Sequence, residues 1–242
     1  MPFKIIEHPK PKLPKVKMQC DEPIDDKLTH IPAICDCFSK NNTTLIAGGT
    51  GSGKTSFIVQ MLRGPMRGCF EDVFLFMPEN SFSSLSERDQ MYFRKHIPQE
   101  NLFHELSPEN LESVYEKLQE NSFEGWHSLL LIDDFGADLK LKPIERLLNL
   151  IALKNRHLRT SMFILCQNYY QMGKKIREIT NNLVMFNTNR SMNEKMFREQ
   201  FTGTDEQFRE LLSLLPNTHS YAILNLKYKR IYVDWNEIKF VD

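Results

Sequence analysis

The chain has 242 residues, of which 41% are hydrophobic, 11% aromatic and 26% charged, and its 31 Lys and Arg residues balance 31 Asp and Glu residues. This composition is typical of a globular protein and excludes a collagen, a coiled coil and a disordered tail. The longest apolar runs, Val73–Met77 and Met162–Cys166, have five residues each, whereas a membrane-spanning helix needs about 20. We therefore expect no membrane span.

The amino-terminal residues and the cysteines indicate the compartment. Met1–Glu7 lacks the apolar core of a secretory signal, so we expect a cytosol-like compartment and no secretion. The five cysteines are odd in number and poorly spaced for a disulfide framework or a zinc site. The seven histidines do not show the spacing of a metal-binding helix.

Charge is sorted along the chain although the total is zero. Residues 1–19 hold five lysines, one glutamate and four prolines, which predicts an extended basic arm ahead of a single folded domain over residues 20–242. Residues 78–125 carry ten acids and four bases, whereas residues 154–177 carry six bases and no acid. These runs are either solvated faces of a neutral domain or surfaces for partners.

The first predicted elements are a short strand over Thr43–Ala47, a glycine-rich turn and a helix over Lys54–Leu62. A second strand over Asp72–Met77 ends at Pro78, and a third strand is predicted over Leu102–Leu106. The chain therefore begins to alternate strands with helices.

A helix follows the third strand, with Ser107 suited to cap its amino end and Pro108 in its first position. Apolar residues then recur at helical spacing at positions 111, 114, 115 and 118. The remaining predicted elements are a strand over Ser128–Ile132, a helix with the apolar face Ile144, Leu147, Leu148 and Ile151, strands over Thr160–Cys166 and Leu183–Phe186, and a hairpin of His219–Leu224 and Lys229–Val233. This alternation predicts an α/β fold with a mostly parallel sheet, helices on both faces and the hairpin at the sheet edge.

A phosphate-binding motif lies between the first strand and the first helix. Its residues satisfy G-x-x-x-x-G-K-[ST] and are followed by Ser56; they are Gly48, Gly49, Thr50, Gly51, Ser52, Gly53, Lys54 and Thr55. Glycines let backbone N–H groups cradle phosphate oxygens, and the helix amino end adds its dipole. We expect Lys54 to hold the β- and γ-phosphates and Thr55 to place its hydroxyl on Mg²⁺. The expected nucleotide is ATP, because the sequence has no guanine-reading N-K-x-D tetrapeptide.

Two carboxylates end the apolar strand that contains Leu129–Ile132. Open α/β sheets bind ligands at the carboxyl ends of their strands, and P-loop NTPases hold Mg²⁺ with an acid at that position. Asp133 is therefore the predicted metal ligand, and Asp134 either polarises the attacking water or is a solvated turn residue. The kinase triplet D-F-G and the GTPase D-x-x-G that also occur within residues 133–136 lack the companion motifs of those families.

Further polar residues surround the strand Thr160–Cys166. Gln167 follows its end, where an amide can reach the γ-phosphate or the lytic water, or is an ordinary polar strand end. Arg156 and Arg159 precede the strand. Their guanidinium groups are either surface groups or fingers that reach the phosphate of a neighbouring subunit.

The order of these motifs resembles the FtsK/HerA superfamily of P-loop ATPases, and within it the compact DNA-packaging ATPases of large DNA viruses and virophages. The resemblance covers residues 43–187 and rests on the phosphate loop, the double aspartate and the basic stretch before the strand that leads to Gln167. It implies a RecA/ASCE-like sheet and an ATP-driven, Mg²⁺-dependent translocase of double-stranded DNA that packages a viral genome into a preformed capsid. It further implies a homo-oligomeric ring, contact with capsid proteins at a portal or vertex, and action in the host cytoplasm at a site of virus assembly.

The same resemblance implies roles for single residues. Asp134 is then the water-activating acid, Gln167 the γ-phosphate sensor and Arg156 the finger in trans, with Arg159 and Arg190 also eligible as the finger. One departure is that the wider superfamily commonly has Glu where Asp134 stands. Three other functions stay open: an AAA-like helicase loader, a nucleoside kinase, and a non-hydrolysing nucleotide-dependent module that binds DNA or capsid.

The acid-free segment 154–177 is the predicted DNA contact. A motor that moves along any sequence contacts phosphates and not base edges, so it needs basic groups on a surface that faces DNA. Lys174, Lys175 and Arg177 follow Gln167 closely enough for a change at the γ-phosphate to reach them. The alternative is that these bases neutralise the acidic segment 78–125, in the same subunit or the next one.

Overall fold

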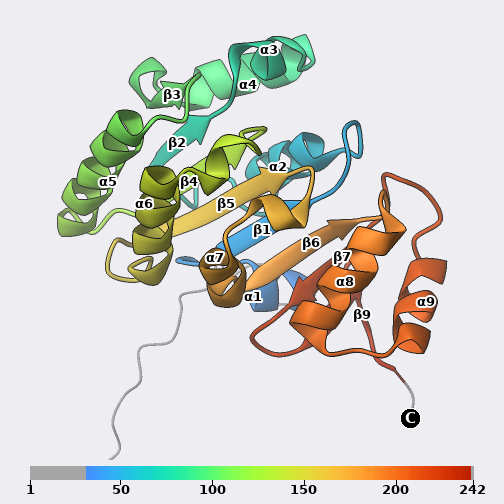
Figure 1. The fold of residues 1–242 in the computed structure, drawn as a ribbon. Helices are drawn as coiled ribbons and strands as arrows, with labels where there is room; N and C mark the ends of the chain where they lie inside the picture. Colours follow the sequence, from blue (N-terminus) through green and yellow to red (C-terminus); the bar gives the residue numbers. More distant parts are fainter. Residues whose placement is uncertain (1–30, 241–242) are drawn as a thin grey trace, which may run out of the picture.

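The computed structural model describes residues 31–240, so the predicted basic arm over residues 1–19 lies outside the described residues. The described chain forms a nine-stranded sheet in the order β3-β2-β4-β5-β1-β6-β7-β8-β9, with helices on both faces (Figure 1). The strands are β1 (Thr43–Ala47), β2 (Asp72–Phe76), β3 (Leu102–Phe103), β4 (Ser128–Asp133), β5 (Thr160–Cys166), β6 (Asn182–Phe186), β7 (Tyr221–Asn225), β8 (Arg230–Val233) and β9 (Asn236–Ile238).

The α-helices connect the parallel strands and follow them. They are α1 (Pro32–Cys37), α2 (Lys54–Arg63), α3 (Glu79–Ser83), α4 (Glu87–His96), α5 (Pro108–Phe123), α6 (Lys142–Leu153), α7 (Lys174–Ile179), α8 (Arg190–Phe201) and α9 (Asp205–Ser213). Between residues 31 and 240 none of the helices combines the length and the apolar character needed to cross a membrane.

The strands β1 to β6 pair in parallel, as predicted. β5 lies between β1 and β4; Ala47 is level with Cys166, and Asp133 is level with Leu165. The carboxyl ends of β1, β5 and β4 therefore lie next to one another, and open parallel sheets bind ligands at the carboxyl ends of their strands. The phosphate loop, Gln167 and the double aspartate all follow these three strand ends.

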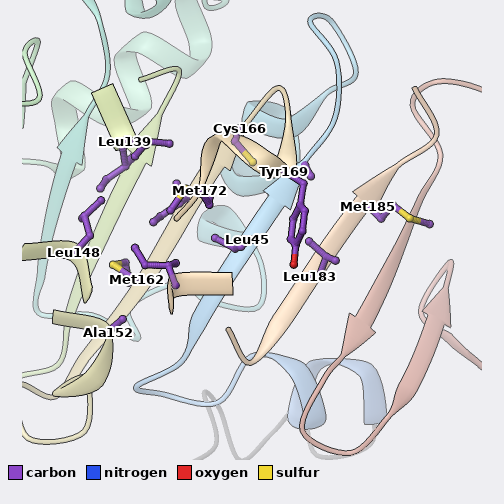
Figure 2. Packing of buried hydrophobic residues seen from close by; sticks show 14 of the residues in the cluster. Leu45, Leu139, Leu148, Ala152, Met162, Cys166, Tyr169, Met172, Leu183 and Met185 are labelled. Atoms are coloured by element: carbon purple, nitrogen blue, oxygen red, sulfur yellow. The ribbon is translucent and has the colours of Figure 1, made fainter. Parts of the chain in front are cut away.

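Both faces of the sheet are buried, which explains why its strands are continuous apolar runs. Alternate residues of β4 enter two cores: Leu130 and Ile132 face helices α5 to α9, whereas Leu129 and Leu131 face helices α1 to α4. Figure 2 shows the first of these cores, in which strand side chains pack beneath Leu148 of α6. The two cores hold β1, β4 and β5 rigidly in the middle of the sheet.

The carboxyl-terminal hairpin is confirmed at the sheet edge and is longer than predicted. β7 runs antiparallel to β6, and β8 runs antiparallel to β7. A third antiparallel strand, β9, pairs with β8 and was not predicted. Its sequence, Asn236–Ile238, has one apolar residue and therefore no alternation to detect.

The predicted strand over Leu102–Leu106 is wrong in length. β3 keeps only its first two residues because its partner β2 ends at Phe76. His104 then turns away from the sheet, with its Nδ1 2.9 Å from the carbonyl oxygen of Met77 and its Nε2 3.0 Å from a carboxylate oxygen of Glu79. A short edge strand thus leads into the Ser107 cap of α5.

Candidate nucleotide-binding and catalytic site

The loop between β1 and α2 has the shape of a phosphate cradle. Gly53, directly before α2, has a φ of 100°, a left-handed conformation that favours glycine. A Cβ on Gly48 would lie 2.7 Å from the Cβ of Phe186 and 2.7 Å from Oγ of Ser52, so a larger residue does not fit. The loop ends in the amino end of α2, whose unpaired N–H groups and dipole favour an anion.

Lys54 lies folded over this loop. Its Nζ donates to the carbonyl oxygens of Gly48 and Gly49, at 2.8 and 3.1 Å. Burial lowers the pKa of Lys54, and the charge of Asp133 acts in the opposite direction. Ser52 adds a buried hydroxyl that has no hydrogen-bond partner among the described residues. An ammonium group held by carbonyls and an unpartnered hydroxyl both fit a phosphate ligand, which supplies acceptors to each.

Thr55 and Asp133 form the oxygen pair expected of a Mg²⁺ site. The Thr55 hydroxyl donates to Oδ2 of Asp133 across 2.6 Å. Asp133 is 5% exposed, and burial raises its pKa to about 6 against the lowering effect of the Thr55 hydrogen bond. In the described part of the chain no three His, Cys, Asp or Glu side chains gather into a metal cage. The oxygen atoms of Thr55 and Asp133 fit Mg²⁺, which is commonly held by one or two protein oxygens together with substrate phosphates and water.

Asp134 is held from two sides just beyond β4. Its φ of 62° is left-handed, a conformation that costs most residues with a Cβ about 1–2 kcal/mol but that Asp tolerates. Nε2 of Gln167 donates to its Oδ1 across 3.0 Å, and the hydroxyl of Ser81 donates to its Oδ2 across 2.7 Å. Two donors fix the direction of this exposed carboxylate while leaving lone pairs for a water molecule. The structure thus brings Asp134 and Gln167 together.

Ser81 is a site residue that the sequence did not indicate. It lies in α3, which follows β2, and β2 pairs with β4 so that Phe76 is level with Ile132. The side chain of Phe82 is buried in the core and anchors α3 beside the end of β4. The one indication in the sequence was that Ser81 is a polar residue that follows β2, and β2 pairs with the strand that ends in the double aspartate.

A hollow of about 430 Å³ continues from the phosphate loop toward strands β6 and β7. Its far wall is formed by Phe186, His219 and Tyr221, and Gln60 of α2 contributes a polar side. The Nδ1 of His219 lies 3.2 Å from the carbonyl oxygen of Ser52. No local sequence pattern marks His219 or Tyr221 as site residues, because the antiparallel pairing of β7 with β6 is what places them beside the loop.

The three candidates for the arginine finger do not lie together. Arg156 and Arg159 are near the amino ends of the strands, and Arg190 is near their carboxyl ends. Arg156 is exposed between α6 and the start of β5, at the edge opposite the phosphate loop. Arg159 lies at that same edge, with its Nη2 2.5 Å from Nε2 of His127. Arg190 begins α8 directly after β6, at the edge of the phosphate loop, and is exposed. The structure therefore does not bring Arg156 to the phosphate loop of its own chain.

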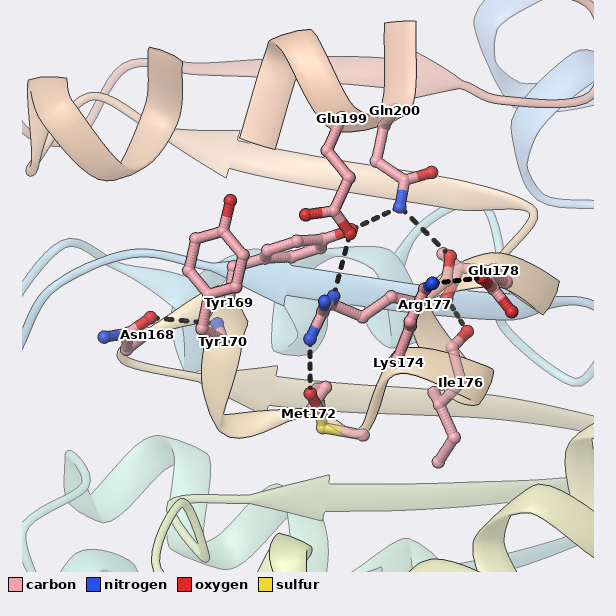
Figure 3. Close-up of polar contacts among 11 residues, drawn as sticks. Asn168, Tyr169, Tyr170, Met172, Lys174, Ile176, Arg177, Glu178, Glu199 and Gln200 are labelled. Carbon is pink, nitrogen blue, oxygen red and sulfur yellow. Dashed lines mark hydrogen bonds and ion pairs between the residues drawn. The ribbon is translucent and has the colours of Figure 1, made fainter. Parts of the chain in front are cut away.

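The predicted basic DNA contact over residues 154–177 is not one surface. Arg177 is 13% exposed and bound within the fold: its Nε contacts Oε1 of Glu199 at 3.0 Å, and its Nη1 donates to the carbonyl oxygen of Met172 at 2.8 Å (Figure 3). It also lies over the rings of Tyr169 and Tyr170. The charge of Arg177 thus fastens the segment after Gln167 to α8 in the structure, and its contact with DNA stays a prediction.

Lys174 and Lys175, by contrast, are exposed on α7. Lys174 makes one ion pair along the helix, 3.5 Å from Glu178, and its side chain is 79% exposed. An exposed pair of this kind contributes little and opens readily. These two lysines are the part of the predicted basic segment that remains accessible to a polyanion.

The family of the chain follows from a match over most of its length. Residues 38–234 match the model of the family described as Poxvirus A32 protein. The chain belongs to the Poxvirus A32 protein family. The matched region contains the phosphate loop, the double aspartate, Gln167 and the hollow lined by His219.

Curated proteins described as DNA packaging protein OPG160 are similar to this chain. Those of variola virus and of vaccinia virus (strain Copenhagen) are each 28% identical to this chain over 183 residues, which is 73% of this chain and 64% of their own length. The monkeypox virus protein has the same identity, with 58% of its length covered. The chain thus spans less than two thirds of these relatives.

Solved structures of low sequence identity share the fold of this A32 family member. The genome packaging NTPase B204 from Sulfolobus turreted icosahedral virus 2, in complex with AMPPCP, has a TM-score of 0.57 at 12% identity and covers 83% of this chain and 99% of its own. EssC (ATPases 2 and 3) from Geobacillus thermodenitrificans has a TM-score of 0.55 at 12% identity and covers 76% of this chain and 38% of its own. The predicted P-loop fold class and the resemblance to viral DNA-packaging ATPases are confirmed.

Proposed function

We propose that residues 20–242 of this A32 family member form an ATPase domain that hydrolyses ATP with Mg²⁺ and drives double-stranded DNA into a preformed capsid. The observation that carries the proposal is that three groups lie together at the carboxyl ends of the central strands. They are the phosphate loop, the Thr55–Asp133 pair, and Asp134 hydrogen-bonded to Gln167. Further support comes from the membership of this chain in the Poxvirus A32 protein family and from its similarity to DNA packaging protein OPG160.

In this proposal the loop binds the triphosphate through its backbone N–H groups. Lys54 exchanges its bonds to Gly48 and Gly49 for phosphate oxygens, and Thr55 and Asp133 hold the metal ion. Mg²⁺ supplies positive charge that offsets the charge of the phosphates. The nucleoside end extends into the hollow lined by His219.

Asp134 then acts on the attacking water. Its carboxylate accepts a hydrogen bond from that water and takes its proton as the water oxygen forms a bond to the γ-phosphorus and the bond to the β–γ bridging oxygen breaks. Gln167 and Ser81 keep the carboxylate pointed at one place, which compensates for the short reach of Asp. A non-hydrolysing binding module has no use for a carboxylate oriented in this way.

The motor requires more than one copy. A single domain of this size does not encircle DNA, so we propose a homo-oligomeric ring that acts at a portal or vertex of the capsid, at a site of virus assembly in the host cytoplasm. Arg156, which is remote from its own phosphate loop, is the proposed finger for the neighbouring nucleotide. Lys174 and Lys175 are the proposed contacts to DNA phosphates.

Release of inorganic phosphate from ATP, with and without double-stranded DNA, tests the proposed function. The wild-type chain is expected to release phosphate in the presence of Mg²⁺ and to do so faster with DNA. Lys54→Ala is expected to release none, whereas Lys239→Ala, a change of the same kind on an exposed tail residue, is expected to match the wild type. Equal rates for Lys54→Ala and the wild type would reject the assignment.

A further inference from the structure

Helix α5 presents a row of acids to solvent. Its apolar side packs into the core through Leu111, Val114 and Leu118, which turns the opposite side outward. The outward side carries four exposed acids, which are Glu109, Glu112, Glu116 and Glu120. Only Glu120 has a basic partner in the described chain, Lys117 at 2.7 Å. We call these four residues the acidic face.

Helix α4 presents the opposite charge. Its buried side chain is Phe93, and the outward side carries Arg88, Met91 and Lys95 at helical spacing. Arg88 and Lys95 are exposed, and neither has an acidic partner among residues 31–240. Met91 lies between them and is 70% exposed. Residues 78–125, which form one acidic segment in the sequence, therefore contain the acidic helix α5 and a helix, α4, in which three bases outnumber two acids.

The end of α2 extends this basic surface. Arg63 bridges the two helices: its Nη1 lies 3.0 Å from Asp89, and its guanidinium carbon lies 4.8 Å from the ring centre of Tyr92. Arg67 adds an exposed cation at the same end. Hollows of about 370 and 500 Å³ open beside these residues, so the surface is shaped to take in protruding side chains. We call Arg67, Arg88 and Lys95, with Met91 and Tyr92, the basic face.

The two faces lie on opposite sides of the sheet. α5 packs into the core shared by α5 to α9, whereas α4 packs into the core shared by α1 to α4 (Figure 1). One molecule therefore does not join its own two faces. A contact between two different surfaces of identical chains repeats head to tail and closes into a ring or continues as a filament.

We propose that the acidic face of one copy docks on the basic face of the next copy, and that this contact joins the subunits of the assembly. The proposal rests on the ring assigned under the proposed function. Seven residues separate Arg88 from Lys95, and seven separate Glu109 from Glu116, which corresponds to about 10 Å along each helix. Two packed helices can therefore match both pairs of charges at once.

Exposed apolar side chains accompany the charges on both partners. Phe123 ends α5 and is 87% exposed, and Met91 is the apolar residue in the middle of the α4 surface. An apolar centre with charges around it is the usual make-up of a protein interface. The charges select the partner and its orientation, and the apolar groups supply contact area.

A second copy explains these surfaces better than DNA does. DNA phosphates attract the basic face but repel the acidic face, which they leave without a partner. Stacking of copies gives each of the two faces a partner of opposite charge.

Charge reversal on each face tests the proposal. The basic-face variant is Arg88→Glu with Lys95→Glu, and the acidic-face variant is Glu109→Lys with Glu116→Lys. In the full chain with a non-hydrolysable ATP analogue and Mg²⁺, sedimentation velocity measures the protein concentration at which half of the chains assemble. Each variant alone is expected to raise this concentration by about tenfold or more, as the removal of several charge pairs does.

An equal mixture of the two variants is expected to assemble as readily as the wild type, because each reversed face then meets a complementary one. A control variant, Glu206→Lys with Glu210→Lys, reverses the charge of two exposed acids on α9 and is expected to assemble normally. Recovery in the mixture also shows that the variants are folded.

Three results overturn the proposal: unchanged assembly of either variant, no recovery in the mixture, or a basic-face variant that assembles normally and instead loses affinity for a DNA duplex. The last result assigns the basic face to DNA. Phosphate release from ATP, measured on the same samples, tests the proposed function separately. A wild-type chain that hydrolyses ATP but never assembles rejects this interface and leaves the ATPase assignment intact.

Discussion

The hydroxyl of Thr55 donates to the carboxylate of Asp133 across 2.6 Å, although 78 residues separate them in the chain. Thr55 is on the first turn of α2, and Asp133 ends β4, which is separated from β1 by β5. The parallel register brings both to one edge of the sheet. This pair places two oxygen donors where an ion bound to the triphosphate needs them.

Asp133→Asn is expected to lower Mg²⁺-dependent ATP hydrolysis and to leave Mg²⁺-independent ATP binding unchanged. An amide keeps the shape of the side chain but loses the charge that holds the cation, so hydrolysis should fall about 100-fold or more, equivalent to several kcal/mol. Binding of ATP in the absence of Mg²⁺ should be retained. Titration with a fluorescent ATP analogue, with and without Mg²⁺, measures the difference. Asp138→Asn is the control, and equal Mg²⁺ dependence in both variants contradicts the assignment.

Ser81→Ala is expected to lower kcat about tenfold, because a hydrogen bond to a charged group contributes about 1.5–3 kcal/mol. The KM for ATP should not change, since Ser81 contacts Asp134 and not the phosphate loop. Ser81→Thr keeps a hydroxyl and should restore most of the rate, and Ser83→Ala on the same helix should behave as the wild type. A rise in KM with kcat unchanged would assign Ser81 to nucleotide binding instead.

The local motifs of the site were predictable from the sequence, whereas the residues added by tertiary structure were not. The phosphate loop and the double aspartate each follow an apolar strand, so their context could be recognised along the chain. Ser81 and His219 reach the site only through strand register, which no local pattern encodes. The basic helix α4 was missed because Phe93 is its one buried side chain, which leaves no apolar periodicity to detect.

Charge patterns were predicted less well than motifs. The segment 154–177 has six bases and no acid, yet Arg177 is neutralised by Glu199, which is 22 residues away on another helix. Counting charges along a segment does not show which side chains the fold pairs with distant residues. Only the structure distinguishes Arg177 from the exposed Lys174.

His219→Ala is expected to raise the KM for ATP several-fold and to leave kcat unchanged, because the hollow binds the nucleoside equally in the ground state and the transition state. Tyr228→Leu changes an exposed aromatic residue of the hairpin loop and serves as the control. Steady-state kinetics with saturating Mg²⁺ measure both constants. An unchanged KM would place the nucleoside outside this hollow.

Replacing Lys174 and Lys175 together by Ala is expected to weaken DNA binding evenly across sequences. The negative slope of the logarithm of the DNA-binding constant against the logarithm of the salt concentration should become shallower by about 2, because each lysine neutralises one DNA phosphate in the wild type. Hydrolysis without DNA should be unaffected. Arg177→Ala, in contrast, should lower the thermal stability of the fold, because it removes the hydrogen bonds to Glu199 and Met172. Normal DNA binding by the double variant would place the DNA-binding surface elsewhere.

The central claim is that Asp134 activates the water that attacks ATP, and the most direct measurement is single-turnover hydrolysis by Asp134→Asn. The amide keeps the size of the side chain but accepts no proton, so this variant should bind ATP with wild-type affinity and hydrolyse it about 100-fold more slowly. Hydrolysis by Asp134→Asn at the wild-type rate would contradict the account and assign the base to another group.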